Sequence, residues 1–484
     1  MARKLVVLHV DGLSTNSLER ALAAGDMPHL RRLIDSEGYE VHPYRCGLPS
    51  TTPFGQAGVL YGDNSEIPSF RWWDRERKVL VKFGPGSTFD RVADKYFQGS
   101  SPLTQDGACI AACFPAGAAE DFGIAYQSRS YGRQEKSRSA AGVLVPYLLN
   151  PIHLGDWVWQ TAAVLGRTAQ DYVVSRSHGR HPARPYLVTN AAEEIFVHHL
   201  TRYAVQKAMR EGYSPIYAGL YAYDEVAHAF GPQDPSALRV MRHIDHTIDK
   251  IARSRDGRYE LVVLSDHGHV DTKPYPASTH HAWGEALAGL LPGYRVLEMN
   301  SGRAYGASED AARGQLNVTA AGGLSHVYFA ERTTRMTHRE LMSLHPDFMA
   351  AVAALPEVAL VMARDGDLDV DVFMSGPERH VGPAVKRVLA PYDEPDILFE
   401  QLRRLNTFQN AGDVVVFGAF IDGKQVNFEN QAGGHASIGG DQLHPFVLAK
   451  KDWGMNLDEV TGAHQLHPLL SDLRDRLASR PQPG

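Results

Sequence analysis

The chain has 484 residues, of which 43% are hydrophobic and 22% are charged, which is the composition of an ordinary globular protein with ample material for a core. The formal net charge of -7 argues against a general nucleic-acid binder, because such a protein needs a basic surface to neutralise phosphates. Three cysteines are too few for a disulfide framework and favour a reducing compartment, so we expect a cytoplasmic protein.

The sequence predicts neither a targeting signal nor a membrane span. The first apolar run is too short for a signal-peptide core and ends at Asp11. The most membrane-like stretch, 140–166, contains Trp157 and Trp159, but polar residues and a proline interrupt it. It therefore falls short of the roughly 20 apolar residues that a span requires. We favour a buried helical insert here, with an interfacial membrane element as the alternative.

The first part of the chain alternates apolar strands with helical segments. Lys4–Asp11 is a near-continuous apolar run, as expected of a buried parallel strand. Ser17–Asp35 follows with leucines at helical spacing, and a strand followed by a helix is the repeating unit of a parallel α/β sheet. The same reasoning predicts helices over Thr88–Tyr96, Glu193–Glu211 and Pro235–Arg253, and strands over Ile216–Tyr223 and Tyr259–Ser265.

The pattern changes between Pro274 and about Gly412, where glycine-rich turns and short elements predict an inserted α+β lobe over about 275–410. Its expected elements are the strands Val327–Phe329 and Ala359–Ala363 and the helix Arg339–Leu355. After it, Val414–Phe417 and Pro445–Leu448 are expected to return to the main sheet, and Leu469–Leu477 to form a helix. We predict one α/β domain over 1–484, with a mostly parallel central sheet flanked by helices, this lobe and a helical insert near 130–210.

Each of three predicted strands ends at, or directly before, an aspartate: Asp11, Asp224 and Asp266. Ligands of an open parallel sheet bind beyond the carboxyl ends of its strands, so these charges are expected to gather at one edge. Crowded carboxylates repel one another, and a cation is their natural partner. His228 follows Asp224 at helical spacing, and His267 directly follows Asp266. Mixed Asp/His ligation suits zinc or another transition-metal ion better than magnesium or calcium.

Each of these motifs has an ordinary structural alternative when it is taken alone. An aspartate after a strand can cap a helix, and Asp224 with His228 can form a surface pair. Pro49–Thr52 can be a turn that enters a helix with a threonine cap, and His435 in its glycine-rich loop can face solvent. Their joint occurrence in this order favours a functional site. Solvated loop positions are expected for the remaining histidines near the Asp-His pair, His269, His280 and His281, with substrate contacts or groups behind the metal ligands as the alternative.

The order of the motifs resembles the alkaline phosphatase superfamily, and within it the type I phosphodiesterase/nucleotide pyrophosphatase family. The matching motifs are Asp11-Gly12, Pro49–Thr52, Asp224–His228, Asp266–Gly268 and Gly433–His435. The resemblance implies two divalent ions, usually zinc, for which manganese or iron can substitute. It implies one ion at Asp224, His228 and His435, and a second at Asp11, Asp266, His267 and the Thr52 hydroxyl.

The resemblance also implies a metal-dependent hydrolase that cleaves a phosphodiester or pyrophosphate bond in a small phosphate ester. Thr52 would be the nucleophile and form a phosphothreonine, with Ser50 and Thr51 as alternatives for that role. A phosphomonoesterase or phosphotransferase is the alternative activity. A metal-stabilised binding protein without catalysis is the alternative class. The sequence does not define the oligomeric state.

One departure from the family concerns the contact with phosphate. The family uses an asparagine downstream of the nucleophile, whereas this chain has Phe70–Asp74 there and Asn64 comes too early. Arg71 can take this role, because a guanidinium binds phosphate oxygens in a bidentate way. The alternative for Arg71 is stacking on Trp72 or Trp73.

Overall fold

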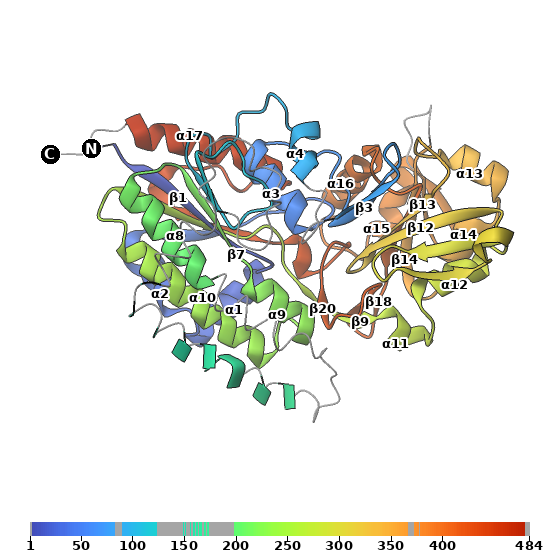
Figure 1. Cartoon of the computed structure of the whole chain (residues 1–484), viewed down its shortest axis with the longest axis horizontal. Coiled ribbons are helices and arrows are strands. Elements are labelled where there is room, and N and C mark those ends of the chain that lie inside the picture. The colour runs from blue at the N-terminus through green and yellow to red at the C-terminus, as the bar shows by residue number, and fades with distance from the viewer. Residues whose placement is uncertain are drawn as a thin grey trace.

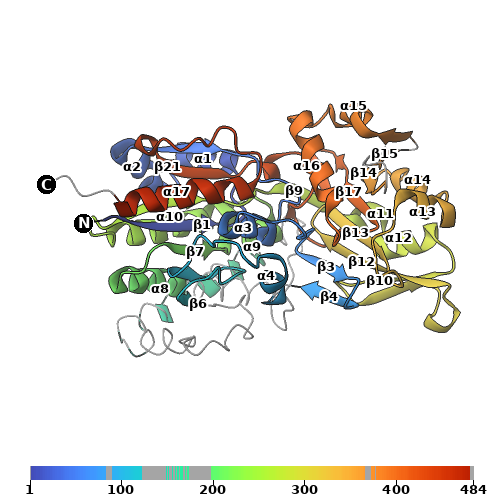
Figure 2. The ribbon, with the colours of Figure 1, turned by 90° about the horizontal axis from the view of Figure 1, so that it is seen from above.

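The computed structural model describes residues 2–82, 90–122, 198–365, 372–376 and 378–479, together with scattered positions between 149 and 173. The described strands form two large sheets that lie side by side (Figure 1, Figure 2). A four-stranded sheet lies between them, with the order β18-β19-β9-β20. Its strands are β9 (Val270–Pro274), β18 (Phe420–Ile421), β19 (Lys424–Asn427) and β20 (Gly433–Gly434).

The main sheet has the order β2-β21-β8-β1-β7-β5-β6, and among these strands only β21 runs against the others. Val10 pairs with Leu220 and His9 with Leu264, so the three central strands end at the same edge. The prediction of a mostly parallel α/β sheet is confirmed. The strands are β1 (Lys4–Val10), β2 (Tyr39–Pro43), β5 (Ala108–Ile110), β6 (Glu120–Phe122), β7 (Ile216–Leu220), β8 (Tyr259–Leu264) and β21 (Phe446–Lys450).

Helices cover both faces of the main sheet. Figure 1 shows α3 and α17 over one face, and α2, α8 and α10 over the other. The bounds of α10 are those predicted, because the Asp234 side chain accepts a bond from the Ser236 amide and Pro235 begins the helix. Residues 88–89 and 193–197 of two other predicted helices lie outside the described residues. The helices are α3 (Thr52–Tyr61), α4 (Asp90–Tyr96), α8 (His198–Glu211), α10 (Pro235–Arg253) and α17 (Leu466–Ser479).

Two predicted segments near the main sheet are divided in the structure. Ser17–Asp35 is a pair of helices, α1 (Thr15–Ala24) and α2 (Pro28–Glu37), because Gly25 ends the first in the left-handed conformation and a proline begins the second. The strand expected over Ile216–Tyr223 ends at Leu220, and α9 (Ala222–Phe230) follows at once. The motif around Asp224 is therefore carried by a helix that begins at the edge of the sheet.

The second sheet is largely antiparallel, with the order β11-β10-β12-β13-β17-β14-β15-β16. Its strands are β10 (Tyr294–Glu298), β11 (Arg303–Gly306), β12 (Gly314–Ala321), β13 (Leu324–Phe329), β14 (Val358–Ala363), β15 (Val372–Ser375), β16 (Glu378–Val381) and β17 (Val414–Gly418). The helices near it are α11 (Tyr275–Thr279), α12 (Trp283–Leu290), α13 (His338–Leu344), α14 (Phe348–Ala353), α15 (Lys386–Leu389) and α16 (Pro395–Thr407). The helix expected over Arg339–Leu355 is thus two helices, on either side of Pro346. The outer limits of the lobe, about 275–410, stay a prediction.

The structure corrects the placement of Val414–Phe417. This segment was expected in the main sheet, but as β17 it lies in the second sheet between β13 and β14. Val414 and Val416 pack into the core on one face of the second sheet, while Val415 and Phe417 belong to the core shared with the main sheet. A run that is apolar on both faces indicates a central strand without indicating which sheet it joins. The other returning segment, Pro445–Leu448, does reach the main sheet as part of β21.

The helical insert expected near 130–210 lies mostly outside the described residues. Where single positions between 149 and 173 are described, several apolar side chains are exposed, including Leu149 and Trp159 at 76% and 74%. These side chains are thus not buried as the favoured interpretation of 140–166 expects. Among the described helices, none has both the length and the apolar character needed to cross a membrane.

A buried ion pair ties the hairpin of β3 (Arg71–Asp74) and β4 (Val79–Lys82) to the second sheet. The Arg75 guanidinium donates to Asp413 Oδ1 at 2.9 Å, and the Asp413 side chain is fully buried. The same carboxylate accepts bonds from the backbone amides of Met336 and Phe329. Loss of this carboxylate therefore leaves the buried Arg75 without its counter-charge and two buried amides without an acceptor.

Asp413→Ala is expected to lower the free energy of unfolding by about 3–5 kcal/mol, because one member of a buried pair is removed. Urea denaturation followed by circular dichroism measures this change. The matched control is Asp472→Ala, which breaks the exposed pair between Asp472 and Arg476 and is expected to cost less than about 1 kcal/mol. Equal effects of the two substitutions would contradict the structural role of Asp413.

Candidate active site

Two loops bring Asp11 and Thr52 together at the edge of the main sheet. Asp11 follows β1 and is 2% exposed, while Thr52 is the first residue of α3. The Thr52 hydroxyl oxygen lies 3.3 and 3.4 Å from the two carboxylate oxygens of Asp11 and 3.4 Å from Nε2 of His267. Of the three neighbouring hydroxyls, that of Ser50 instead accepts a bond from the Ala436 amide.

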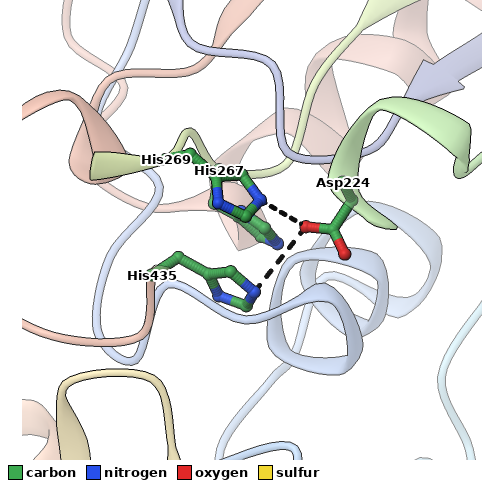
Figure 3. A group of neighbouring side chains, drawn as sticks. All are labelled: Asp224, His267, His269 and His435. Atoms are coloured by element: carbon green, nitrogen blue, oxygen red, sulfur yellow. Dashed lines mark hydrogen bonds and ion pairs between the residues drawn. The ribbon is translucent and has the colours of Figure 1, made fainter. Parts of the chain in front are cut away.

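A second group surrounds Asp224 on α9 (Figure 3). One of its carboxylate oxygens lies 2.7 Å from Nε2 of His269 and 3.7 Å from Nε2 of His435, and the other lies 3.3 Å from Nε2 of His228. The Nε2 atoms of His228 and His435 are 3.1 Å apart. The structure therefore brings all seven residues implied as metal ligands to one place: Asp11, Thr52, Asp224, His228, Asp266, His267 and His435.

Backbone carbonyls orient three of the imidazoles. Nδ1 of His228 lies 3.1 Å from Gly433 O, Nδ1 of His267 lies 3.0 Å from Gly268 O, and Nδ1 of His435 lies 2.7 Å from Ser50 O. A carbonyl oxygen can only accept, so each Nδ1 carries a proton and Nε2 is the ring atom that remains to bind an ion. All three Nε2 atoms face the carboxylates, which is the arrangement that a metal-binding histidine requires.

Two glycines allow this crowding. Gly12 has a φ of +73°, and a Cβ there would lie 2.7 Å from Oδ1 of Asp224 and 2.9 Å from the His269 ring. Gly55, in the first turn of α3, would place a Cβ 2.7 Å from that of Asp266. The helix that carries Thr52 can therefore lie against the Asp-His turn only because this position lacks a side chain.

The electrostatics of the site call for positive charge. Burial raises the pKa of Asp11 well above its usual range, and the charges of Asp266 and Asp224 raise it further. Burial alone would lower the pKa of His228, but the Asp224 carboxylate beside it raises that pKa to about 9. Burial also acts to raise the pKa of Asp266, but contacts with His267 and His9 lower it to about 2. The buried carboxylates are thus stabilised by positive charge beside them, which a bound cation would supply.

The donor set fits two divalent ions. Ligand atoms of His9, Asp11 and Asp266 lie within 4.8 Å of one another, as do those of a second group, Asp224, His267, His269 and His435. By distance His267 belongs to this second group, but it also lies 3.4 Å from Asp11 Oδ1 and can serve either position. Oδ2 of Asp266 is buried and makes no hydrogen bond, as expected of an atom that faces an ion. Nitrogen and oxygen ligands together suit zinc, manganese or iron.

A cavity of about 180 Å³ opens above these residues. Thr52, Asp11 and Asp224 line it, whereas Ser50 and Thr51 do not. Its wall includes Arg71 and Glu429, whose side chains form an ion pair at 3.1 Å. The ring within cation–π distance of Arg71 is that of Phe70. Asn64 has a structural contact instead, because its amide donates to the carbonyl of Phe54 within α3.

Two site residues were missed or misplaced by the sequence analysis. His269 was expected in a solvated loop, but it is 2% exposed and contacts Asp224. It points inward because β9 begins at Val270 and pairs with β20, which leads to His435. His280 and His281 are exposed, as expected. His9 was not singled out, although a histidine inside an otherwise apolar buried strand was a usable signal.

Comparison with known proteins adds the family. The model of the type I phosphodiesterase/nucleotide pyrophosphatase family matches residues 5–347. The chain belongs to this family. It is a phosphodiesterase/pyrophosphatase-like hydrolase of the alkaline phosphatase superfamily. No curated protein matched the sequence in a direct search.

Solved structures of this superfamily have the same fold. Phosphonoacetate hydrolase from Sinorhizobium meliloti 1021, in complex with phosphonoformate, is similar with a TM-score of 0.54 and 14% identity, covering 99% of this chain and 96% of that one. Murine ectonucleotide pyrophosphatase/phosphodiesterase 5 is similar with a TM-score of 0.51 and 12% identity, covering 100% and 97%. At these identities the likeness establishes the alkaline-phosphatase-like fold.

Gly12→Ala is expected to destabilise the protein by about 2–5 kcal/mol, because a left-handed backbone and a steric clash add up. The matched control is Gly25→Ala. Gly25 has a nearly equal φ of +78° with nothing within 4 Å of the added methyl group, so only the backbone term of about 1–2 kcal/mol applies. Urea denaturation of both variants without added metal measures the difference. A Gly12 variant as stable as the Gly25 variant would contradict the packing described here.

Proposed function

We propose that the chain hydrolyses a phosphodiester or pyrophosphate bond with the aid of two divalent ions, using Thr52 as the nucleophile. The observation that carries this proposal is the position of the Thr52 hydroxyl. It lies at the floor of the cavity and within 3.4 Å of both Asp11 and His267. A threonine hydroxyl reacts slowly at neutral pH unless its proton is made easier to remove.

Two sets of side chains would hold the ions. Asp224, His228 and His435 would bind one, with His269 against the same carboxylate. The other would be bound by Asp11, Asp266, His267 and Thr52. Zinc is our proposal for both, with manganese or iron as substitutes. When bound, such ions lower the pKa of a coordinated hydroxyl and neutralise phosphoryl oxygens on the attacking and leaving sides.

The reaction proceeds through two displacements at phosphorus. Thr52 Oγ1 forms a bond to phosphorus as the bond to the leaving oxygen breaks, and the hydroxyl proton passes through solvent to the leaving group. Water then attacks the phosphothreonine, the bond between phosphorus and Oγ1 breaks, and Thr52 recovers its proton. Because Thr52 is the first residue of α3, the positive end of that helix dipole stabilises negative charge on Oγ1 and on the phosphoryl group.

Arg71 is our proposal for the contact with the substrate phosphate. It lines the cavity, and its pairing with Glu429 holds the guanidinium at the wall. A cavity of about 180 Å³ accommodates the reacting group of a small phosphate ester, with the remainder of the molecule outside it. The phosphonate in the Sinorhizobium meliloti structure and the AMP bound to an inactive form of the murine enzyme support a ligand of this class. All three cysteines are buried thiols, which supports the cytoplasm as the compartment.

The alternative activity is cleavage of a phosphate monoester or transfer of the phosphoryl group, since both can use the same phosphothreonine. The diester is favoured because the family model is that of phosphodiesterases and nucleotide pyrophosphatases. A binding protein without catalysis is disfavoured by the family assignment and by a threonine hydroxyl that lines the cavity beside Asp11 and His267.

Metal removal tests the proposed function directly. After treatment with a chelator the protein is expected to lose hydrolysis of bis-p-nitrophenyl phosphate, because no ion then lowers the pKa of the Thr52 hydroxyl or neutralises the phosphoryl oxygens. Zinc or manganese is expected to restore it. Release of nitrophenol from this diester is expected to exceed release from p-nitrophenyl phosphate. Faster release from the monoester would favour the alternative activity, and no turnover of either compound with two ions bound would overturn the proposal.

Thr52→Ala is expected to reduce turnover by more than about 1,000-fold, because the nucleophile is removed. The matched control is Thr51→Ala. Thr51 precedes the same helix and its side chain makes no capping bond, so little activity should be lost. Thr52→Ser should retain part of the activity, and metal content is measured in all three variants. A Thr52→Ala protein with wild-type turnover would move the nucleophile to Ser50 or Thr51.

A further inference from the structure

His9 is a fully buried histidine in the central strand β1 that the proposed reaction leaves without a role. Its Nε2 lies 2.9 Å from Oδ1 of Asp266, and its Nδ1 lies 3.2 Å from Nε2 of Gln56. The Gln56 side chain is also fully buried, on α3. The phenol oxygen of Tyr221 lies 2.7 Å from the same Gln56 nitrogen. We call His9, Gln56 and Tyr221 the positioning relay.

Hydrogen bonds fix the direction of each group in the relay. The backbone amide of Cys113 donates to Oε1 of Gln56 at 2.7 Å, and since an amide N–H can only donate, this bond fixes which end of the Gln56 side chain is oxygen. Nε2 of Gln56 therefore has two protons to offer, one to Tyr221 and one to His9 Nδ1. The Tyr221 hydroxyl in turn donates to the carbonyl of Ala111, and its oxygen accepts the bond from Gln56.

The tautomer of His9 follows from this chain of bonds. Its Nδ1 accepts, so the ring proton is on Nε2, which lies 2.9 Å from Oδ1 of Asp266. This is the opposite of the tautomer that the carbonyls impose on His228, His267 and His435. A nitrogen that carries a proton cannot bind a metal ion, so His9 is excluded as a ligand although it lies within reach of Asp11 and Asp266.

The consequence falls on the Asp266 carboxylate. Its Oδ1 accepts from the backbone amides of Gly12 at 3.3 Å and His267 at 3.0 Å and lies 2.9 Å from Nε2 of His9, so that oxygen is enclosed by these three groups. Its Oδ2 makes no hydrogen bond and lies 3.6 Å from Nε2 of His267. The carboxylate is therefore locked in one orientation, with a single oxygen left for an ion.

We propose that the positioning relay orients Asp266 for the second metal ion by fixing the His9 tautomer. The inference rests on the proposed function, since it assigns a task to residues around the same site. Removing a bond behind a metal ligand typically weakens binding by about 10- to 100-fold while the ligand itself remains in place.

Zinc titration of the full chain by calorimetry tests the relay, with His9→Phe as the first variant and His9→Gln as its conservative partner. A glutamine amide can still donate to Asp266 from near the position of Nε2, whereas the phenyl ring keeps the shape and loses both bonds. His9→Phe is expected to bind two ions, one of them about 10- to 100-fold more weakly, and His9→Gln to recover most of this loss. Wild-type affinity in His9→Phe would overturn the proposal, as would a loss of one ion in both variants, which would make His9 a ligand.

Tyr221→Phe provides a second test that does not depend on the fold of the His9 variants. It removes the hydroxyl that anchors Gln56 and is expected to weaken the same ion in the same direction, by less than His9→Phe. Unchanged affinity in this variant would count against the relay. Circular dichroism of each variant separates weak binding from misfolding.

Nitrogen NMR of the histidine-labelled wild-type protein reports the tautomer itself. A proton on Nε2 of His9 is expected, and a proton on Nδ1 would overturn the assignment. This measurement needs neither metal nor turnover, so it stands even if the protein proves not to hydrolyse phosphate esters. A protein with the expected tautomer and no affinity for zinc would instead contradict the proposed function.

Discussion

Three buried carboxylates converge at the edge of the main sheet, and the groups around them offset their mutual repulsion. Asp11, Asp224 and Asp266 come from distant parts of the chain and raise one another's cost of ionisation. Five histidines and the start of α3 surround them. The glycines at 12 and 55 allow these groups to approach, because a side chain at either position would clash with them.

The sequence predicted the site residues that lie at strand ends, but few of the features that depend on contacts between distant segments. Asp11 and Asp266 could be placed because an apolar run halts at each of them, and parallel strands end at one edge. His269 could not, since its inward direction depends on β9 pairing with a strand more than 160 residues later. The same limit applies to β17, whose side chains fill two cores at once, and to His9, whose partners Gln56 and Tyr221 come from two other elements.

The second sheet completes the site without supplying any of its proposed metal ligands. Gly322, in the turn between β12 and β13, and Glu429, after β19, form part of the cavity wall. Glu429 accepts bonds from the Gly322 amide, from Asn300 and from Arg71, so it joins three separate segments at that wall. The edge of the main sheet thus gathers the reactive groups, while the second sheet and the four-stranded sheet shape the space in which a substrate lies.

The order of elements along the chain has a consequence for how the protein is made. His435 comes after the whole second sheet, and β21 inserts beside β8 later still. A nascent chain therefore exposes Asp11, Asp224 and Asp266 long before the ribosome releases their last partner. During that interval the three carboxylates lack the elements that enclose them in the folded protein, so the cluster is completed only after residues 433–450 have been made.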